Sequence, residues 1–208
     1  PYQSGIRHGV PYKNILSYAS DNDIDLIVMG SQGRAGLDRF LLGSVTERVV
    51  QLSDVPVLTA PSSVIGQEVT GYDSILLSTD GSPAANAAVT SGMDIADQLD
   101  ATVHVLSVIR SGRGLPSLSD PARVQVEETV ESVAEEATRR GIEVETHVQS
   151  GNPHERIRKF VTKRSIDLIT MGTHGQSGVK RSLLGGVTEK VLRTSEAPVL
   201  TVRLPNTK

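Results

Sequence analysis

The chain has 208 residues, of which 38% are hydrophobic and 22% are charged, the balance of an ordinary soluble globular protein. Its 21 Lys and Arg against 24 Asp and Glu give a formal net charge of −3, which argues against a general nucleic-acid binder. It has no apolar run long enough to cross a bilayer. It also has no cysteine, so disulfides, thiol catalysis and Cys-ligated zinc are excluded, and a cytoplasmic location is expected.

Apolar runs and turn residues predict alternating strands and helices along the whole chain. Over residues 1–60 we expect a strand, a helix, a strand at 26–29, a loop, a helix and a strand at 57–59. The polar stretch 61–70 is interpreted as a linker. Beyond it, strands are predicted at 74–79, 101–109, 142–149, 166–171 and 198–202, with helices at 83–99, 122–140, 153–164 and 188–195. This order is typical of an open, Rossmann-like parallel sheet with helices on both faces.

An internal repeat divides the chain into two copies of one domain. Residues 9–60 align with 151–202 without a gap, and 24 of these 52 pairs are identical. We therefore expect a partial copy at 1–60, which holds only the C-terminal portion of the domain, and a complete copy at 71–203. The opening of the first copy is either absent from the protein or lies outside this sequence. Because the partial copy would expose sheet edges, we expect it to pack on the complete copy or on another chain.

A glycine-rich loop follows one strand in each copy and points to phosphate binding. Its spacing is Gly-x2-Gly-x9-Gly, with Gly30, Gly33 and Gly43 in the partial copy and Gly172, Gly175 and Gly185 in the complete copy. Glycines tolerate positive φ and let the backbone approach a phosphate, and the helix that begins after the last glycine favours an anion. The alternative is that they only form tight turns. Walker and GxGxxG motifs are both absent.

Other candidate residues carry weaker signals. Asp80 ends the first strand of the complete copy and either accepts hydrogen bonds from a nucleoside or caps the next helix. His147 and His154 flank a turn and suggest a metal pair, but no third ligand is evident, so a surface role is favoured. His174 lies inside the glycine loop, and Gln32 at the matching position argues against a catalytic imidazole.

These motifs together make the chain resemble a tandem universal stress protein of the ATP-binding type. The resemblance rests on STDGS at 78–82, DLITMGTHG at 167–175, LLGGVTE at 183–189 and APVL at 197–200. It implies a five-stranded parallel sheet of order 3-2-1-4-5 in each copy, the first being incomplete. It also implies bound ATP, or AMP or ADP, with Mg²⁺ or Mn²⁺ on the phosphates. Members usually dimerise, so we expect a homo-oligomer or pairing of the two copies, with no nucleic-acid or membrane partner.

The resemblance assigns the nucleotide contacts to residues of both copies. In the complete copy they are Thr79, Asp80, Val108, Met171, Gly172, His174, Gly175, Gly185, Gly186, Val187 and Thr188, and in the partial copy Gly30, Gly33, Gly43, Ser44 and Thr46. Gly186 departs from the family pattern, because it replaces the hydroxyl residue that Ser44 supplies. We expect weaker phosphate binding there, by roughly 1 kcal/mol, with Thr188 standing nearby as a second hydroxyl.

The function expected is that of a nucleotide-binding stress-response module with regulatory or chaperone-like action. At most slow ATP hydrolysis is expected, because no general base is evident and no catalytic or metal-ligating residue is assigned. Two alternatives stay open. One is a dimeric scaffold of the same fold that binds no nucleotide, and the other is a pyrophosphatase-like enzyme of a related fold.

Overall fold

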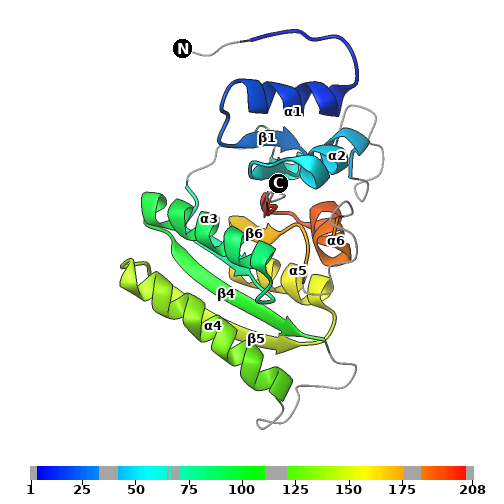
Figure 1. The fold of residues 1–208 in the computed structure, drawn as a ribbon. Coiled ribbons are helices and arrows are strands. Elements are labelled where there is room, and N and C mark those ends of the chain that lie inside the picture. The colour runs from blue at the N-terminus through cyan, green and yellow to red at the C-terminus, as the bar shows by residue number, and fades with distance from the viewer. Residues whose placement is uncertain are drawn as a thin grey trace.

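A computed structural model of the chain describes residues 4–32, 42–64, 66, 71–110, 121–175 and 184–204. These residues form one seven-stranded sheet with helices on both faces (Figure 1). The elements in chain order are α1 (Pro11–Asp21), β1 (Ile27–Gly30), α2 (Ser44–Leu52), β2 (Val57–Ala60), the 3₁₀ turn η1 (Ser62–Val64), β3 (Ser74–Ser78), α3 (Pro83–Leu99), β4 (Thr102–Ile109), α4 (Pro121–Arg139), β5 (Val144–Ser150), α5 (Pro153–Arg164), β6 (Leu168–Gly172), α6 (Gly186–Thr194) and β7 (Val199–Val202). Among these helices, none combines the length and apolar character that a membrane span needs.

The strand order of the complete copy is the one expected. The whole sheet runs β1-β2-β7-β6-β3-β4-β5, so the five strands of the complete copy stand in the order 3-2-1-4-5. All four pairings among them are parallel. The chain therefore reverses its direction of winding beside β3, where ligands of open α/β sheets bind beyond the carboxyl ends of the strands.

The partial copy joins the same sheet instead of forming a separate one. Strand β2 pairs antiparallel with β7, with Leu58 opposite Leu200, and Thr201 Oγ1 donates a hydrogen bond to the Val57 carbonyl at 3.2 Å. Arg203 donates to the Leu52 carbonyl at 3.1 Å across the same junction. The expected packing of the partial copy on the complete copy thus takes the form of a continuous sheet.

The expected first strand of the partial copy was wrong for the described residues. Residues 4–10 are extended or bent but make no ladder, and the described part of this copy contributes only β1 and β2. Strand β1 is consequently a sheet edge, and Val28 is 62% exposed. The matching Thr170 lies between two neighbouring strands in the complete copy and is fully buried.

Two apolar clusters hold the helices to the sheet. Helices α3 and α4 cover one face through residues such as Met93 and Val133, which pack on Ile75 and Val105. On the other face, α5 and α6 form one cluster with α1 and α2 of the partial copy. At roughly 25 cal/mol per Å² of buried apolar surface, burial on both faces is the main stabilising contribution to such a sheet.

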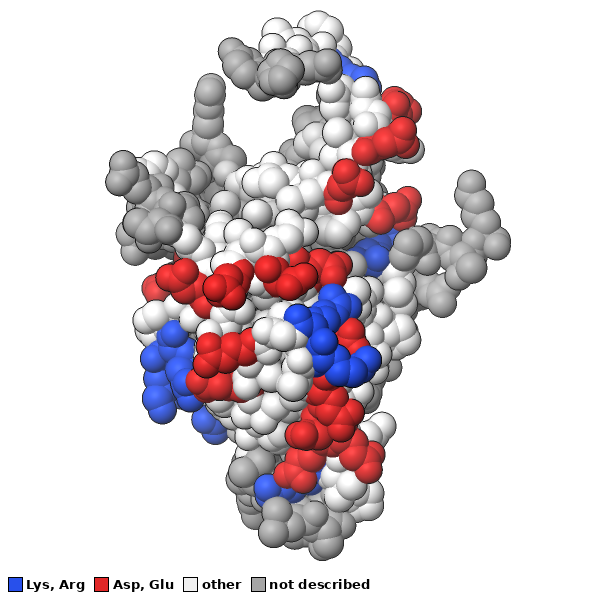
Figure 2. All heavy atoms as spheres, turned by 90° about the vertical axis from the view of Figure 1, so that its left-hand side faces the viewer, with Lys and Arg blue, Asp and Glu red and all other residues white. Residues whose placement is uncertain are grey.

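Charged side chains of both signs cover the face drawn in Figure 2. Asp and Glu form red bands there, and Lys and Arg gather in separate blue groups. Arg140, in the turn that follows α4, links two helices, since it contacts Asp94 of α3 at 2.7 Å and Glu136 of α4 at 2.8 Å. Helix α4 has an acidic solvent-facing side that includes Glu128, Glu131 and Glu135, which are all exposed.

Candidate functional site

Three segments of the complete copy meet beyond the carboxyl ends of β3 and β6. The register pairs Ser78 with Met171 on one side and with Leu106 on the other. Two hydrogen bonds then fix the segments: Ser82 Oγ donates to the His174 carbonyl at 3.3 Å, and the Gly185 amide donates to the Thr173 carbonyl at 2.8 Å. The loops at 79–82, 172–175 and 184–188 are therefore neighbours, although they are up to about a hundred residues apart in sequence.

Asp80 stands exposed at the centre of this edge and does not cap the helix. The N-cap of α3 is Ser82, whose Oγ accepts from the Ala85 amide at 3.3 Å. The Asp80 carboxylate instead accepts from the Ser82 amide at 3.0 Å, a local turn that fixes its direction. Thr79 is buried, and its hydroxyl accepts from the Gly81 amide at 3.1 Å. Of the two roles considered for Asp80, helix capping is wrong.

In the complete copy the described loop glycines are explained by close approach and not by positive φ, contrary to one of the two roles expected of them. None of Gly172, Gly175 and Gly185 has a left-handed backbone. A Cβ on Gly172 would lie 2.7 Å from the Ala84 carbonyl carbon, so this glycine lets β6 approach the first turn of α3. A Cβ on Gly175 would overlap the Asp80 carboxylate, which places the loop directly against that side chain.

Helix α6 begins at this edge without a side-chain cap. Its N-cap is Gly185, and no described side chain accepts from its first turn. The first amides of a helix have no intrahelical partner and carry the positive end of the helix dipole, so this terminus attracts anions. Gly186 is exposed, and a Cβ built on it meets no described atom within 4 Å, which leaves room beside the terminus. Val187 follows in the same turn and is partly buried.

Thr188 makes a hydrogen bond within the protein through its hydroxyl. Its side chain is 4% exposed and its hydroxyl donates to the Gly172 carbonyl at 2.8 Å, so it ties α6 to the end of β6. Thr46 makes the matching bond to the Gly30 carbonyl at 2.9 Å in the partial copy. The threonine retained in both copies thus has a structural role in joining the helix to the end of the strand.

The remaining expected residues of the complete copy occupy distinct positions. Continuing the β3–β4 register places Asp80 level with Val108, whose main chain reaches the same edge. The Met171 side chain is 4% exposed and belongs to the core, so only its main chain is near the loop. His174 is partly buried, and its Nδ1 lies 2.9 Å from the Thr173 hydroxyl.

The partial copy repeats the loop geometry at the opposite edge of the sheet. The Gly43 amide donates to the Ser31 carbonyl at 2.8 Å, as Gly185 does to Thr173, and Ser44 is exposed at the start of α2. Because β2 is antiparallel to β7, the carboxyl ends of β1 and β2 face away from those of β6 and β7. Gly33 lies outside the described residues. The described ends of the two glycine loops lie at opposite edges of the sheet.

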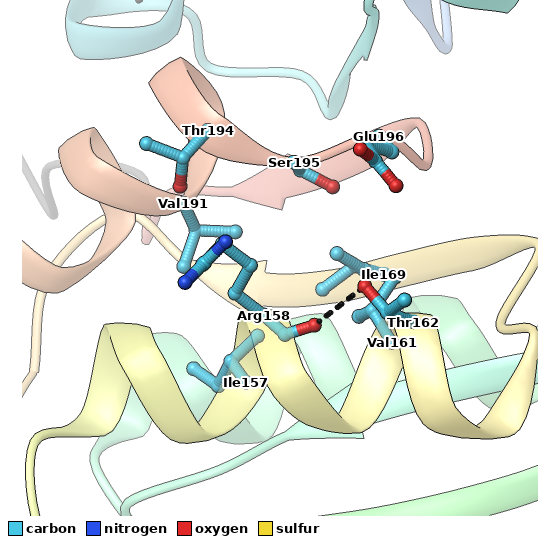
Figure 3. A pocket seen from close by; sticks show the side chains of 9 residues that line it. All are labelled: Ile157, Arg158, Val161, Thr162, Ile169, Val191, Thr194, Ser195 and Glu196. Carbon is cyan, nitrogen blue, oxygen red and sulfur yellow. Dashed lines mark hydrogen bonds between the residues drawn. The ribbon is translucent and has the colours of Figure 1, made fainter.

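Among the cavities lined by described residues are two that lie away from the glycine loop. The first holds about 40 Å³ between α5 and α6, too little for a nucleotide. Figure 3 shows the Arg158 side chain extending toward α6 across it, while Thr162 Oγ1 donates to the Arg158 carbonyl at 3.2 Å. The second holds about 390 Å³ in a groove between α3 and α4, where Gly81 lies at one end.

A cluster on β4 and β5 that was not predicted from the sequence consists of His104, Glu145 and His147, and we call it the β4–β5 triad. Glu145 Oε2 lies 3.7 Å from His104 Nδ1 and 3.5 Å from His147 Nε2. A surface role was favoured for His147, but its side chain is only 17% exposed and lies near His104 and Glu145 across the two strands. The sequence signal was the alternation of Glu145 and His147, which places both side chains on one face of a strand.

Comparisons with known proteins agree with the repeat. The model of the universal stress protein family matches residues 2–61 and 71–203. Universal stress protein MJ0531 of Methanocaldococcus jannaschii is 32% identical over 152 residues, 69% of this chain and 89% of that protein. Slr1230 of Synechocystis is 29% identical over 182 residues, 87% of this chain, and the chain spans only 58% of its length.

Solved structures give the same fold. A universal stress protein from Archaeoglobus fulgidus superposes with a TM-score of 0.71 at 27% identity, over 94% of this chain and 67% of that one. A universal stress protein in complex with cAMP has a TM-score of 0.53 at 23% identity, over 64% of this chain and 98% of that one. At that identity the second match establishes the shared fold alone. With both copies matched by the family model, the chain belongs to the universal stress protein family.

Proposed function

We propose that the complete copy binds an adenine nucleotide beyond the carboxyl ends of β3 and β6. ATP is the first candidate, and AMP and ADP are the others. The observation that carries the proposal is the convergence of an exposed carboxylate and an uncapped helix start. Asp80 can accept hydrogen bonds from the nucleoside, and the first amides of α6 can donate to the phosphates. Gly175 lies directly against the Asp80 carboxylate, so the loop that leads toward α6 is next to the proposed nucleoside contact.

The main chain supplies most of the proposed contacts. Val108 lies level with Asp80 and offers main-chain groups to the base, while Gly172, His174 and Gly175 line the path between the nucleoside and α6. Mg²⁺ or Mn²⁺ would accompany the phosphate tail, and it would be held mainly by phosphate oxygens. A related fold that holds cAMP supports the general suitability of this architecture for adenine nucleotides.

The proposed action is regulatory binding with at most slow hydrolysis. Both titratable side chains among the described residues of the loops contribute to loop structure: Asp80 accepts from the Ser82 amide, and His174 contacts the Thr173 hydroxyl. Neither arrangement leaves a group dedicated to activating water. The lack of cysteines fits a reducing cytoplasm, which we include in the proposal.

The alternative is a scaffold that binds no nucleotide, and one observation favours it. Gly186 has no hydroxyl, and the hydroxyl of Thr188 is already bonded to the Gly172 carbonyl, so the phosphate end of the site relies on main-chain amides. Pairing through β2 and β7 could by itself organise such a scaffold. The two functions differ in one measurable property, which is affinity for ATP.

Calorimetric titration of ATP in the presence of Mg²⁺ tests the proposal. The chain should bind ATP, and Asp80→Asn should weaken binding by at least about tenfold, because hydrogen bonds to charged groups contribute about 1.5–3 kcal/mol. Asp97→Asn is the matched control, since Asp97 is an exposed carboxylate farther along α3. Absence of heat at millimolar ATP, or equal loss in both variants, would favour the scaffold.

A further inference from the structure

The β4–β5 triad lies on the face of the sheet covered by α5, away from the glycine loops. The register sets His104 directly opposite Glu145, and His147 follows two residues later on the same face of β5. Side-chain atoms of the three residues approach within 4.8 Å of one another. The triad therefore joins β5, which is an edge strand of the sheet, to its single described neighbour β4.

Two buried nitrogen atoms in the triad lack a hydrogen-bond partner. Among the described residues, nothing donates to or accepts from His104 Nδ1 or His147 Nε2 within hydrogen-bond distance. His104 is only 5% exposed, so water does not readily compensate. An unsatisfied buried polar group costs about 1–3 kcal/mol. Both atoms lie near Glu145 Oε2, at 3.7 Å and 3.5 Å, without forming a hydrogen bond to it.

The surroundings keep the two imidazoles neutral, the form that binds metal ions. Burial lowers the pKa of His104 and of His147, and the nearby Arg164 guanidinium acts in the same direction. Glu145 opposes this shift for both rings, and Glu143 opposes it for His104. Phe160 of α5 packs on the rings, with centroids 4.7 Å from His147 and 5.9 Å from His104.

We propose that His104, Glu145 and His147 form a binding site for a divalent first-row transition metal ion, Zn²⁺ above all. Two imidazole nitrogens and one carboxylate are a ligand set that Zn²⁺ uses, with water in the remaining position. Tetrahedral bonds of about 2.0–2.1 Å place neighbouring ligand atoms about 3.4 Å apart, close to the two distances that Glu145 already makes. Because the Glu145 side chain is 46% exposed, it gives the ion and its water a route to solvent.

The positive charge of Arg164 opposes the binding of a metal ion at Glu145. Its guanidinium donates to Glu145 Oε2 at 2.8 Å, the same oxygen that faces both imidazoles. Its side chain is 40% exposed at the end of α5, so it can leave this oxygen for solvent at little cost. Competition between Arg164 and the ion is a consequence of the site that no purely structural role of the histidines would produce.

Zinc titration of untagged, chelator-treated protein without nucleotide tests the site. The full chain should bind one Zn²⁺ at the triad, and Co²⁺ should give the visible absorption of a low-coordinate cobalt site with imidazole ligands. Glu145→Gln and His147→Gln should each weaken binding by at least about 10-fold, because loss of even an outer-shell partner costs about 10- to 100-fold. His154→Gln is the matched control and should leave the affinity unchanged.

Arg164→Gln supplies a readout of opposite sign. Removing the competing guanidinium should strengthen zinc binding, whereas a pair of histidines that merely fills the core would not respond. The proposal would be overturned if the chain and all its variants bound zinc with equal affinity. It would also be overturned if His154→Gln abolished zinc binding. The Glu145 side chain is 46% exposed, so Glu145→Gln should fold even if changes at buried His104 do not. Glu145→Gln should bind ATP with the same affinity as the unchanged chain, so the zinc site and the nucleotide site can be tested independently.

Discussion

Restoring a hydroxyl at position 186 should strengthen phosphate binding in the complete copy. Gly186 is the first residue of α6, and its counterpart Ser44 begins α2. A Cβ built on Gly186 meets no described atom within 4 Å, and its backbone is not left-handed, so a serine fits without strain. The new hydroxyl would lie beside the free amides of the first turn, where the phosphate tail is proposed to bind.

The size of the effect follows from one added hydrogen bond. Such a bond contributes about 0.5–1.5 kcal/mol net, and 1 kcal/mol corresponds to about a fivefold change in Kd. Gly186→Ala is the matched control, because it adds the same Cβ and removes the same backbone freedom without a hydroxyl. The difference between the two variants therefore isolates the hydroxyl from any general stabilisation of the helix start, which alone is worth about 0.4–1 kcal/mol.

The assay is calorimetric titration of ATP and of adenosine into the chain and both variants. Gly186→Ser should lower the Kd for ATP about fivefold relative to Gly186→Ala and leave the Kd for adenosine unchanged. Equal ATP affinity in the two variants would refute the placement of phosphates at the start of α6. Equal improvement for ATP and adenosine would refute it as well, because adenosine carries no phosphate.

Three further predictions concern the loop glycines and the two histidines of the β4–β5 triad. Gly172→Ala should lower the free energy of unfolding in urea by about 1–3 kcal/mol, because its Cβ would lie 2.7 Å from backbone atoms. Gly30→Ala should lower it much less, because the nearest atom to its Cβ is 3.4 Å away. Equal losses of stability in the two variants would contradict this explanation. Gly175→Ala should displace the Asp80 carboxylate and weaken ATP binding more than it lowers the melting temperature; a fall in melting temperature alone would count against the site. Because burial lowers the pKa of both triad histidines below 6.5, the folded chain binds fewer protons than the unfolded chain, so the metal-free protein should lose stability as pH falls below about 6.5. The loss should be smaller in His147→Gln, and unfolding curves that shift equally with pH in both proteins would contradict it.

Much of the fold could be predicted because its signals are local or repeated. Short apolar runs between turn residues identified the strands of the complete copy, and Pro153 at the start of α5 fixed that helix start. The alternation of strands and helices predicted an open parallel sheet, and the resemblance to the family supplied the strand order 3-2-1-4-5. The expected helix at 188–195 begins two residues earlier, at Gly186, because its start is defined by backbone geometry and not by a capping side chain.

The parts that escaped prediction depend on contacts between distant segments. Thr188 looked like a free hydroxyl beside a phosphate, yet it bonds to a carbonyl sixteen residues away. Gly172 looked like a turn glycine, yet the helix packed above it is what excludes a side chain. His104 and His147 are 43 residues apart and become neighbours only through the β4–β5 register. A linear pattern of residue types does not contain that register.

A crystal structure of the chain grown with ATP and Mg²⁺ tests the central claim most directly. The account predicts nucleoside density beside Asp80 and Val108, and phosphate density at the start of α6 next to Gly186. Density for ATP only at the loop of Ser44, or in the groove between α3 and α4, would contradict it, as would a structure at saturating ATP with no nucleotide at this edge.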